Sequence, residues 1–143
     1  MKIFTIGFTK TSAQRFFGRL KDSGAKKLVD VRLNNISQLA GFAKRDDLKY
    51  FTSQICGIGY EHVPALAPTK EMLDEYKKNG GAWDAYAEKF IGLMEKRHIE
   101  NLNREQLDGG CLLCSEDKPH QCHRRLVAEY LRDKWSDIEI VHL

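Results

Sequence analysis

The chain lacks a long apolar run and a leader-like segment. None of its apolar stretches approaches the roughly 20 residues that a membrane-spanning helix needs, and no basic segment followed by an apolar one opens it, as a secretory signal would. Internal repeats and low-complexity segments are also missing, so neither a repeat array nor a compositionally biased protein is indicated. We therefore expect a cytoplasmic protein without a membrane partner.

A strong excess of one charge is missing as well. The net charge is +3 and the isoelectric point is near 8.6. A dedicated nucleic-acid binder typically has an isoelectric point above about 9. The glycine pattern of a dinucleotide fingerprint and the glycine-lysine-serine or -threonine sequence of a P-loop are both incomplete. Mildly basic charge permits contact with phosphates, so the composition alone does not decide the function.

Cysteine is scarce, with four residues at Cys56, Cys111, Cys114 and Cys122. The even number is compatible with disulfides, but a reducing compartment and a full-sized core favour free thiols. A chain of 143 residues with 42% hydrophobic side chains is large enough for one continuous core. We expect a single α/β domain over residues 1–143.

Apolar segments of strand and helix length alternate along the chain. Strands are predicted at residues 2–7, 27–31, 59–63, 110–115 and 137–142, and helices at 12–23, 46–56 and 119–134, with two or three more in 69–107. This alternation predicts a three-layer α/β/α fold, Rossmann-like and doubly wound, with a mostly parallel five-stranded sheet. We expect the first strand at the centre, the second and third to one side, and the fourth on the other, with the ligand cleft between strands one and four.

Residues 112–125 contain the densest group of reactive side chains. Two thiols, two imidazoles, two carboxylates and two adjacent guanidinium groups lie between a predicted strand and a predicted helix. Pro119 suits the first turn of that helix, because its missing N–H has no helical partner there. Since a helix N-terminus holds anions and favours a thiolate, we predict the functional centre at this turn.

Within this segment, Cys114 and Cys122 are candidate nucleophiles. His123 is a candidate acid or base, and Glu116 is placed to orient it or to take a proton itself. Each of two residues also has a structural alternative. His123 shares a helical face with apolar residues and would then be a core histidine, and Cys122 would be a small buried residue that only fills space in the core.

Two segments that follow earlier strands are candidate anion-binding elements. Gly7, Thr9, Thr11 and Ser12 form a turn whose hydroxyls and helix N–H groups would cradle a phosphate. The alternative is that Thr11 or Ser12 only caps the following helix. We expect this turn, the segment 30–32 and the segment 114–125 to converge on one cleft.

Asp30 and Arg32 lie two positions apart and project to the same side of an extended chain. Arg32 would offer its planar fork to an oxyanion, while Asp30 holds it in place or works as a base. The alternative is a structural ion pair at the end of a strand.

Residues 33–45 have no clear pattern, which is typical of a functional or a disordered loop. In this loop Phe42 would stack on a nucleobase and Lys44 would contact a phosphate, or the loop is solvated with Phe42 as its one anchoring ring.

Zinc-type ligands occur at Cys111, Cys114, Cys122 and His123. In a strand, however, Cys111 and Cys114 point to opposite faces, and they lie about 10 Å apart along the chain. We therefore predict no metal and no cofactor. Arg124 is kept as a candidate ligand-binding residue, because neighbouring helical side chains diverge and only one of the two arginines would face the cleft.

Five short blocks in order along the chain resemble the family called domain of unknown function 488. The blocks are Thr5-Ile6-Gly7, Asp30-Val31-Arg32, Phe42-Ala43-Lys44, Leu112-Leu113-Cys114-Ser115-Glu116 and Cys122-His123-Arg124. The resemblance implies a compact α/β protein of bacteria or archaea and supplies no established reaction. Where the family usually has asparagine-proline-arginine-serine, this chain has Asn34-Asn35-Ile36-Ser37, so no second arginine is available there.

Together these patterns predict an intracellular enzyme that acts on a phosphate-bearing substrate, a nucleotide or a nucleic acid. Arg32 and the turn at 7–12 would bind the anion, Cys114 or Cys122 would be the nucleophile, and proton transfer would fall to His123, Glu116 and Asp30. The alternative is a non-catalytic module that binds a nucleotide or a nucleic acid with the same polar groups.

Overall fold

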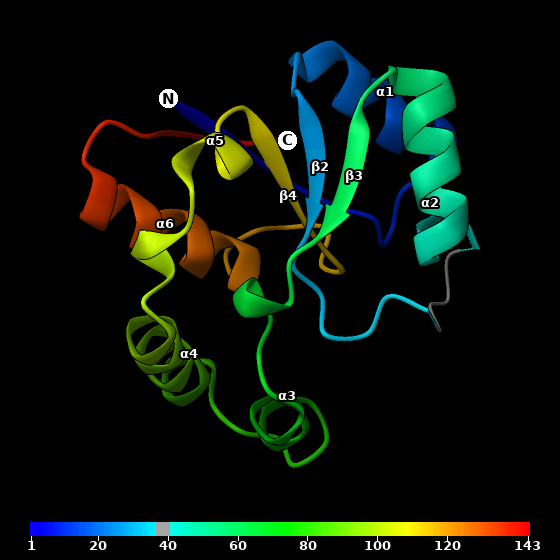
Figure 1. The fold of residues 1–143 in the computed structure, drawn as a ribbon. Coiled ribbons are helices and arrows are strands. Elements are labelled where there is room, and N and C mark those ends of the chain that lie inside the picture. Colours follow the sequence, from blue (N-terminus) through cyan, green and yellow to red (C-terminus); the bar gives the residue numbers. More distant parts are fainter. Residues whose placement is uncertain (37–40) are drawn as a thin grey trace.

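Strands and helices alternate in the computed structural model, which describes residues 1–36 and 41–143 (Figure 1). The longest of the described helices has 15 residues, and none of them is both long and apolar enough to cross a membrane. The elements are β1 (Lys2–Gly7), α1 (Ala13–Ser23), β2 (Lys27–Asp30), η1 (Gly41–Ala43), α2 (Arg45–Phe51), η2 (Thr52–Cys56), β3 (Gly59–His62), η3 (Pro64–Leu66), α3 (Lys70–Lys77), α4 (Trp83–Arg97), η4 (Ile99–Asn101), α5 (Arg104–Leu107), β4 (Gly110–Cys114), α6 (His123–Trp135) and β5 (Glu139–His142).

The strands form one five-stranded sheet in the order β3-β2-β4-β1-β5, and every pairing is parallel. The predicted α/β class with a parallel sheet is confirmed, as is the pairing of the first strand with the fourth. The predicted central place of β1 with β2 beside it is wrong, because β4 is the central strand and lies between β1 and β2. All five residues of β4 are buried, which is typical of a strand covered on both faces at the centre of a sheet.

Helices cover both faces of the sheet. Figure 1 shows α1 and α2 beside one face and α4, α5 and α6 beside the other. The first layer includes Phe16 and Phe17, and the second includes Phe90 and Val127. The side chains of β4 divide between these two cores, with Cys111 and Leu113 in the first and Leu112 and Cys114 in the second. As predicted, Cys111 and Cys114 face opposite sides of the sheet.

The last helix starts later than predicted. Pro119 does not begin α6; its carbonyl instead accepts a hydrogen bond from the Cys122 N–H at 3.2 Å. Cys122 is extended, at φ −135° and ψ 139°, and the helix begins with His123. Residues 115–122 therefore form an ordered loop between β4 and α6, and this loop borders the candidate site.

Candidate functional site

A pocket lies beyond the carboxyl ends of β2 and β4, next to the start of α6. Its cavity volume is about 160 Å³. The wall combines residues that follow β2, the end of β4 with the loop behind it, the start of α6, and the pair α3 and α4. The lining residues are Arg32, Leu33, Asn34, Pro68, Leu73, Tyr76, Lys77, Trp83, Tyr86, Cys114, Ser115, Glu116, Gln121, Cys122 and His123.

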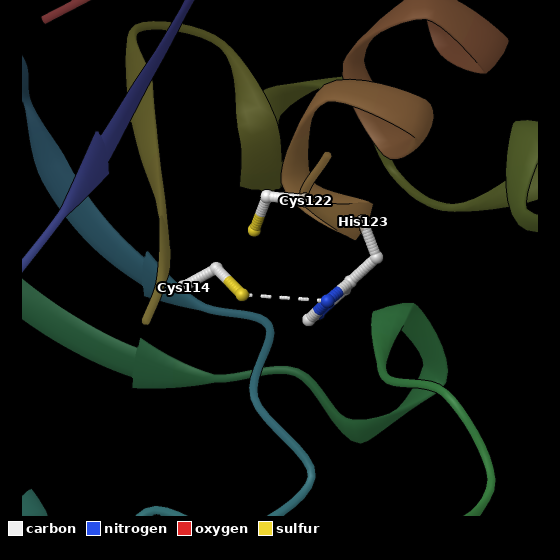
Figure 2. Close-up of side chains that lie close together, drawn as sticks. All are labelled: Cys114, Cys122 and His123. Atoms are coloured by element: carbon white, nitrogen blue, oxygen red, sulfur yellow. Dashed lines mark hydrogen bonds between the residues drawn. The ribbon is translucent and has the colours of Figure 1, made fainter. Parts of the chain in front are cut away.

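Two cysteines and a histidine meet in this wall and are called the thiol–imidazole cluster below: Cys114, Cys122 and His123. Cys114 is the last residue of β4, Cys122 caps α6, and His123 is the first residue of that helix. One side-chain sulfur or nitrogen from each of the three lies within 4.8 Å of the other two. Figure 2 shows the His123 ring directed at Cys114, with its Nδ1 at 3.3 Å from Sγ.

The imidazole of His123 is held by the main chain of another element. Its Nε2 lies 2.7 Å from the carbonyl oxygen of Val31, just after β2. A carbonyl only accepts, so Nε2 donates and carries the proton, and in the neutral ring Nδ1 is an acceptor. The ring also packs against Phe90, with centroids 5.4 Å apart. His123 is thus a buried histidine whose Nδ1 faces the Cys114 thiol.

The two thiols of the cluster differ in acidity. Burial raises the pKa of Cys114 well above its usual value, and the neighbouring Cys122 raises it further. Burial also acts to raise the pKa of Cys122, but hydrogen bonds with Cys114 and His123 and the charges of His123 and Arg124 outweigh it, so the pKa is lowered well below its usual value. Cys122 is therefore the more acidic thiol of the pair.

Asp30 and Arg32 form a buried ion pair at the end of β2. The Arg32 Nε donates to Oδ1 of Asp30 at 2.9 Å and Nη2 donates to Oδ2 at 2.8 Å, while the Tyr60 hydroxyl donates to the same Oδ2 at 2.5 Å. Burial acts to raise the pKa of Asp30, but the hydrogen bonds and charge of Arg32 keep it below its usual value. Asp30 is thus a fixed carboxylate that orients Arg32, which is only 2% exposed and borders the pocket. The third guanidinium nitrogen, Nη1, is buried and has no hydrogen-bond partner among residues 1–36 and 41–143.

Arg124 supports the loop 115–122 and does not line the pocket. Its side chain is fully buried, and Nη1 and Nη2 donate to the carbonyl oxygens of Glu116 at 2.5 Å and Asp117 at 3.5 Å. Gly7 packs against the same carbonyl, since a Cβ at this position would lie 1.6 Å from the Glu116 oxygen. The Thr9 hydroxyl donates to the Ser115 carbonyl at 2.8 Å. The turn at 7–12 therefore braces the loop, while the other two predicted segments line the pocket.

The remaining predicted residues lie at the rim or elsewhere. Glu116 lines the pocket and pairs with Lys77 at 2.8 Å. Ser12 caps α1 by accepting from the Arg15 N–H at 3.2 Å, and Thr11 precedes it in the same turn. Lys44 is exposed at the start of α2 and borders a different hollow. Residues 37–40 of the predicted loop, including Ser37, lie outside the described residues.

Aromatic side chains of α3 and α4 complete the pocket, and sequence reasoning did not assign them to the site. Tyr76 packs on Trp83 and Tyr86, with ring centroids 5.6 and 5.0 Å apart. The spacing of Trp83 and Tyr86 indicates one face of a helix. Only the packing of α3 beside α4 turns that face into a wall of the pocket.

Comparison with known proteins supplies a family and no reaction. The family model "Domain of unknown function DUF488" matches residues 12–131, a range that includes the ion pair, the loop and the thiol–imidazole cluster. Comparisons with curated proteins and with solved structures gave no match. The match covers most of the chain and includes four of the five sequence blocks, so this protein belongs to the DUF488 family.

Proposed function

We propose that this protein is an enzyme that acts on a small phosphate-bearing substrate, such as a nucleotide or the end of a nucleic acid, with Cys122 as its nucleophile. One observation carries the proposal: Arg32 borders the same pocket as the thiol–imidazole cluster. An anion-binding group and a nucleophile would thus act on one bound molecule.

Arg32 supports anion binding because it is already oriented. Its fork is fixed by two hydrogen bonds to Asp30, and its guanidinium carbon lies 5.1 Å from the centroid of the Phe8 ring. Ordering a guanidinium in advance lowers the entropic cost of binding. The remaining nitrogen, Nη1, has no partner, and Lys77 at the rim adds a second positive charge. These groups favour a ligand with a phosphate or another oxyanion.

The thiol–imidazole cluster supports nucleophilic chemistry. Attack by the Cys122 thiolate would form a bond from sulfur to the substrate while the leaving group departs with the proton of the Cys114 thiol. Water would then cleave this intermediate: its hydroxyl would bond to the substrate, Cys122 would leave as the thiolate, and the water proton would pass to the Cys114 thiolate, directly or by way of His123 Nδ1. The net reaction is hydrolysis, and the cluster returns to its starting protonation.

The aromatic wall supports a substrate with a flat ring. Tyr76, Trp83 and Tyr86 line the pocket beside the cluster, and aromatic side chains stack on nucleobases of any sequence. A nucleotide would use both this wall and the cationic side chains, whereas inorganic phosphate would use the cationic side chains alone. We place the enzyme in a reducing compartment, such as the cytoplasm, where its thiols stay free.

Alkylation of the reduced protein tests the proposal. Iodoacetamide should label Cys122 faster than Cys56, the matched thiol that lies half-buried on the other side of the sheet and whose pKa is raised by burial. Adenosine monophosphate should slow labelling of Cys122 but not of Cys56, and Arg32→Lys should weaken this protection because a lysine lacks the guanidinium fork.

Three outcomes separate the alternatives. Fast labelling of Cys122 with protection by the nucleotide supports the enzyme. Nucleotide binding to a protein whose Cys122 labels no faster than Cys56 supports the non-catalytic binding module instead. Slow labelling without any binding of nucleotide or phosphate rejects both.

A further inference from the structure

We propose that Cys114, Cys122 and His123 form a binding site for one thiophilic divalent cation, Zn²⁺, with its fourth coordination position open to the pocket. The inference goes beyond the proposed function, because it requires neither a phosphate nor a covalent intermediate. A bound ion would occupy the Cys122 sulfur, so the metal-bound form is distinct from the metal-free form in which Cys122 is the nucleophile. It also differs from the four-ligand site that the sequence argued against, since Cys111 faces the opposite core and takes no part.

Distances within the cluster suit a tetrahedral metal. Zinc binds sulfur at about 2.3 Å and imidazole nitrogen at about 2.0–2.1 Å, which places neighbouring ligand atoms roughly 3.5–3.8 Å apart. The three donor atoms here lie within 4.8 Å of one another, and the Cys114 Sγ to His123 Nδ1 distance is 3.3 Å. Small side-chain rotations would therefore bring the donors to bonding positions without moving β4 or α6.

The surroundings of His123 match those of a metal ligand. A metal-bound histidine almost always donates its second ring N–H to a carboxylate or a backbone carbonyl, which fixes the ring and its tautomer. Here Nε2 is 2.7 Å from the Val31 carbonyl, and Nδ1 is the nitrogen that faces the two sulfurs. The imidazole is thus oriented before any ion arrives.

Charge and access also favour this site. All three side chains are buried, at 5%, 3% and 7% exposed, and a divalent cation between two thiolates and a neutral imidazole leaves the buried group without net charge. Each of the three lines the pocket, so the fourth position faces a cavity. Three protein ligands and one open position are typical of reactive rather than structural zinc sites.

Cobalt provides the direct test, because Co²⁺ replaces Zn²⁺ and is visible by absorbance. Reduced, metal-free protein should bind one Co²⁺ per chain, with the intense visible bands of tetrahedral coordination and a thiolate-to-cobalt charge-transfer band. Zn²⁺ should displace it. The variants Cys114→Ser, Cys122→Ser and His123→Asn should each weaken Zn²⁺ binding by at least about 100-fold, the upper end of the loss for an outer-shell partner, whereas Cys56→Ser should bind as the parent does.

Protection from alkylation keeps the test independent of how well the variants fold. In the unmodified protein, Zn²⁺ should block iodoacetamide labelling of Cys114 and Cys122 and leave Cys56 unaffected. A blank cobalt spectrum, or an unchanged spectrum in the Cys114→Ser/Cys122→Ser double variant, overturns the metal site. Fast labelling of Cys122 in protein that gives no cobalt spectrum would support the proposed function and reject the metal site. A tetrahedral cobalt spectrum together with an unreactive Cys122 in metal-free protein would support the metal site and reject Cys122 as the nucleophile.

Discussion

The two faces of β4 carry the same kinds of residue in very different settings. Toward α1 and α2, Cys111 is fully buried in a core with Phe16 and Phe17, and burial raises the pKa of its thiol. Toward α4 and α6, Cys114 lies at the carboxyl end of the strand, with a second thiol and an imidazole beside it. Three positions along one strand thus separate a packed thiol from a member of the thiol–imidazole cluster.

This contrast shows what makes a site on this fold. Both faces are covered by helices and both cores contain aromatic rings. On the second face, the start of α6 lies at the carboxyl end of β4, and parallel sheets bind ligands at this end. The chemistry follows from the position of a side chain along the strand rather than from its residue type.

Removing the carboxylate of Asp30 should have the largest effect on stability, because this carboxylate is one half of the buried ion pair beside the pocket. Asp30→Ala leaves Arg32 charged and buried, and should lower the free energy of unfolding by about 3–5 kcal/mol at pH 7. The pKa of Asp30 lies below its ordinary value of 3.8, so its contribution is present above that pH and is lost as the pH falls through the lowered pKa.

Urea unfolding at pH 7 and at progressively lower pH measures both parts of this prediction. The difference between the parent and Asp30→Ala should shrink at the acid end. Asp22→Ala, at an exposed position in α1, should stay within about 0.5 kcal/mol of the parent. Equal stability of Asp30→Ala and the parent at pH 7 would show that the ion pair does not stabilise the protein.

Two glycine substitutions should have the next largest difference in stability, one against the loop 115–122 and one in α1. Gly7→Ala places a Cβ 1.6 Å from the Glu116 carbonyl oxygen, so the loop has to shift, and we expect a loss of about 3 kcal/mol, the upper end of the usual cost of overpacking. Gly18→Ala in α1 has open space around it and should stabilise the helix by about 0.5–1 kcal/mol. Thermal unfolding measures both, and similar effects of the two changes would contradict the tight docking of the loop.

Serine replacements test the two thiols of β4 directly. Cys111→Ser puts a hydroxyl into an apolar core and should destabilise the protein by about 1–3 kcal/mol. Cys114→Ser should cost about 1 kcal/mol or less, because its hydroxyl can donate to Nδ1 of His123 in place of the thiol. Chemical denaturation of the two variants under reducing conditions measures the difference. A larger loss of stability for Cys114→Ser than for Cys111→Ser would contradict the assignment of Cys111 to the apolar core and Cys114 to the polar cluster.

The smallest effect is expected at the rim of the pocket. Lys77 and Glu116 pair at 2.8 Å with side chains 50% and 41% exposed, and an exposed ion pair contributes between about 0 and 1 kcal/mol. Lys77→Ala should therefore leave the unfolding midpoint nearly unchanged while weakening the binding of adenosine monophosphate. If stability falls by as much as in Gly7→Ala, this pair is structural and the rim has no separate role.

Local patterns in the sequence predict the elements of this fold and several members of its site. Alternation of apolar runs is sufficient to place the five strands, and an apolar run that ends at Cys114 is sufficient to place that residue at a strand end. The order of the strands is not a local property. In the central place between β1 and β2, β4 is buried on both faces. That burial depends on how all the strands and helices pack together and not on the sequence of β4 alone.

The features around the pocket that sequence reasoning did not anticipate have the same kind of explanation. Arg124 is directed to two carbonyls of the preceding loop, so its partners are main-chain atoms that no residue pattern reveals. The late start of α6 follows from the turn that closes on the Pro119 carbonyl. Tyr76 and Trp83 join the pocket through the packing of α3 on α4, a contact between elements that their own spacing does not encode.

The hydrogen bond from His123 to the Val31 carbonyl makes the direction of the imidazole ring a property of the backbone. Every residue offers such an oxygen, so amino-acid replacement at position 31 can alter bulk or polarity there without deleting the acceptor. The side chains around the pocket can therefore change in the course of evolution while Nδ1 stays directed at Cys114.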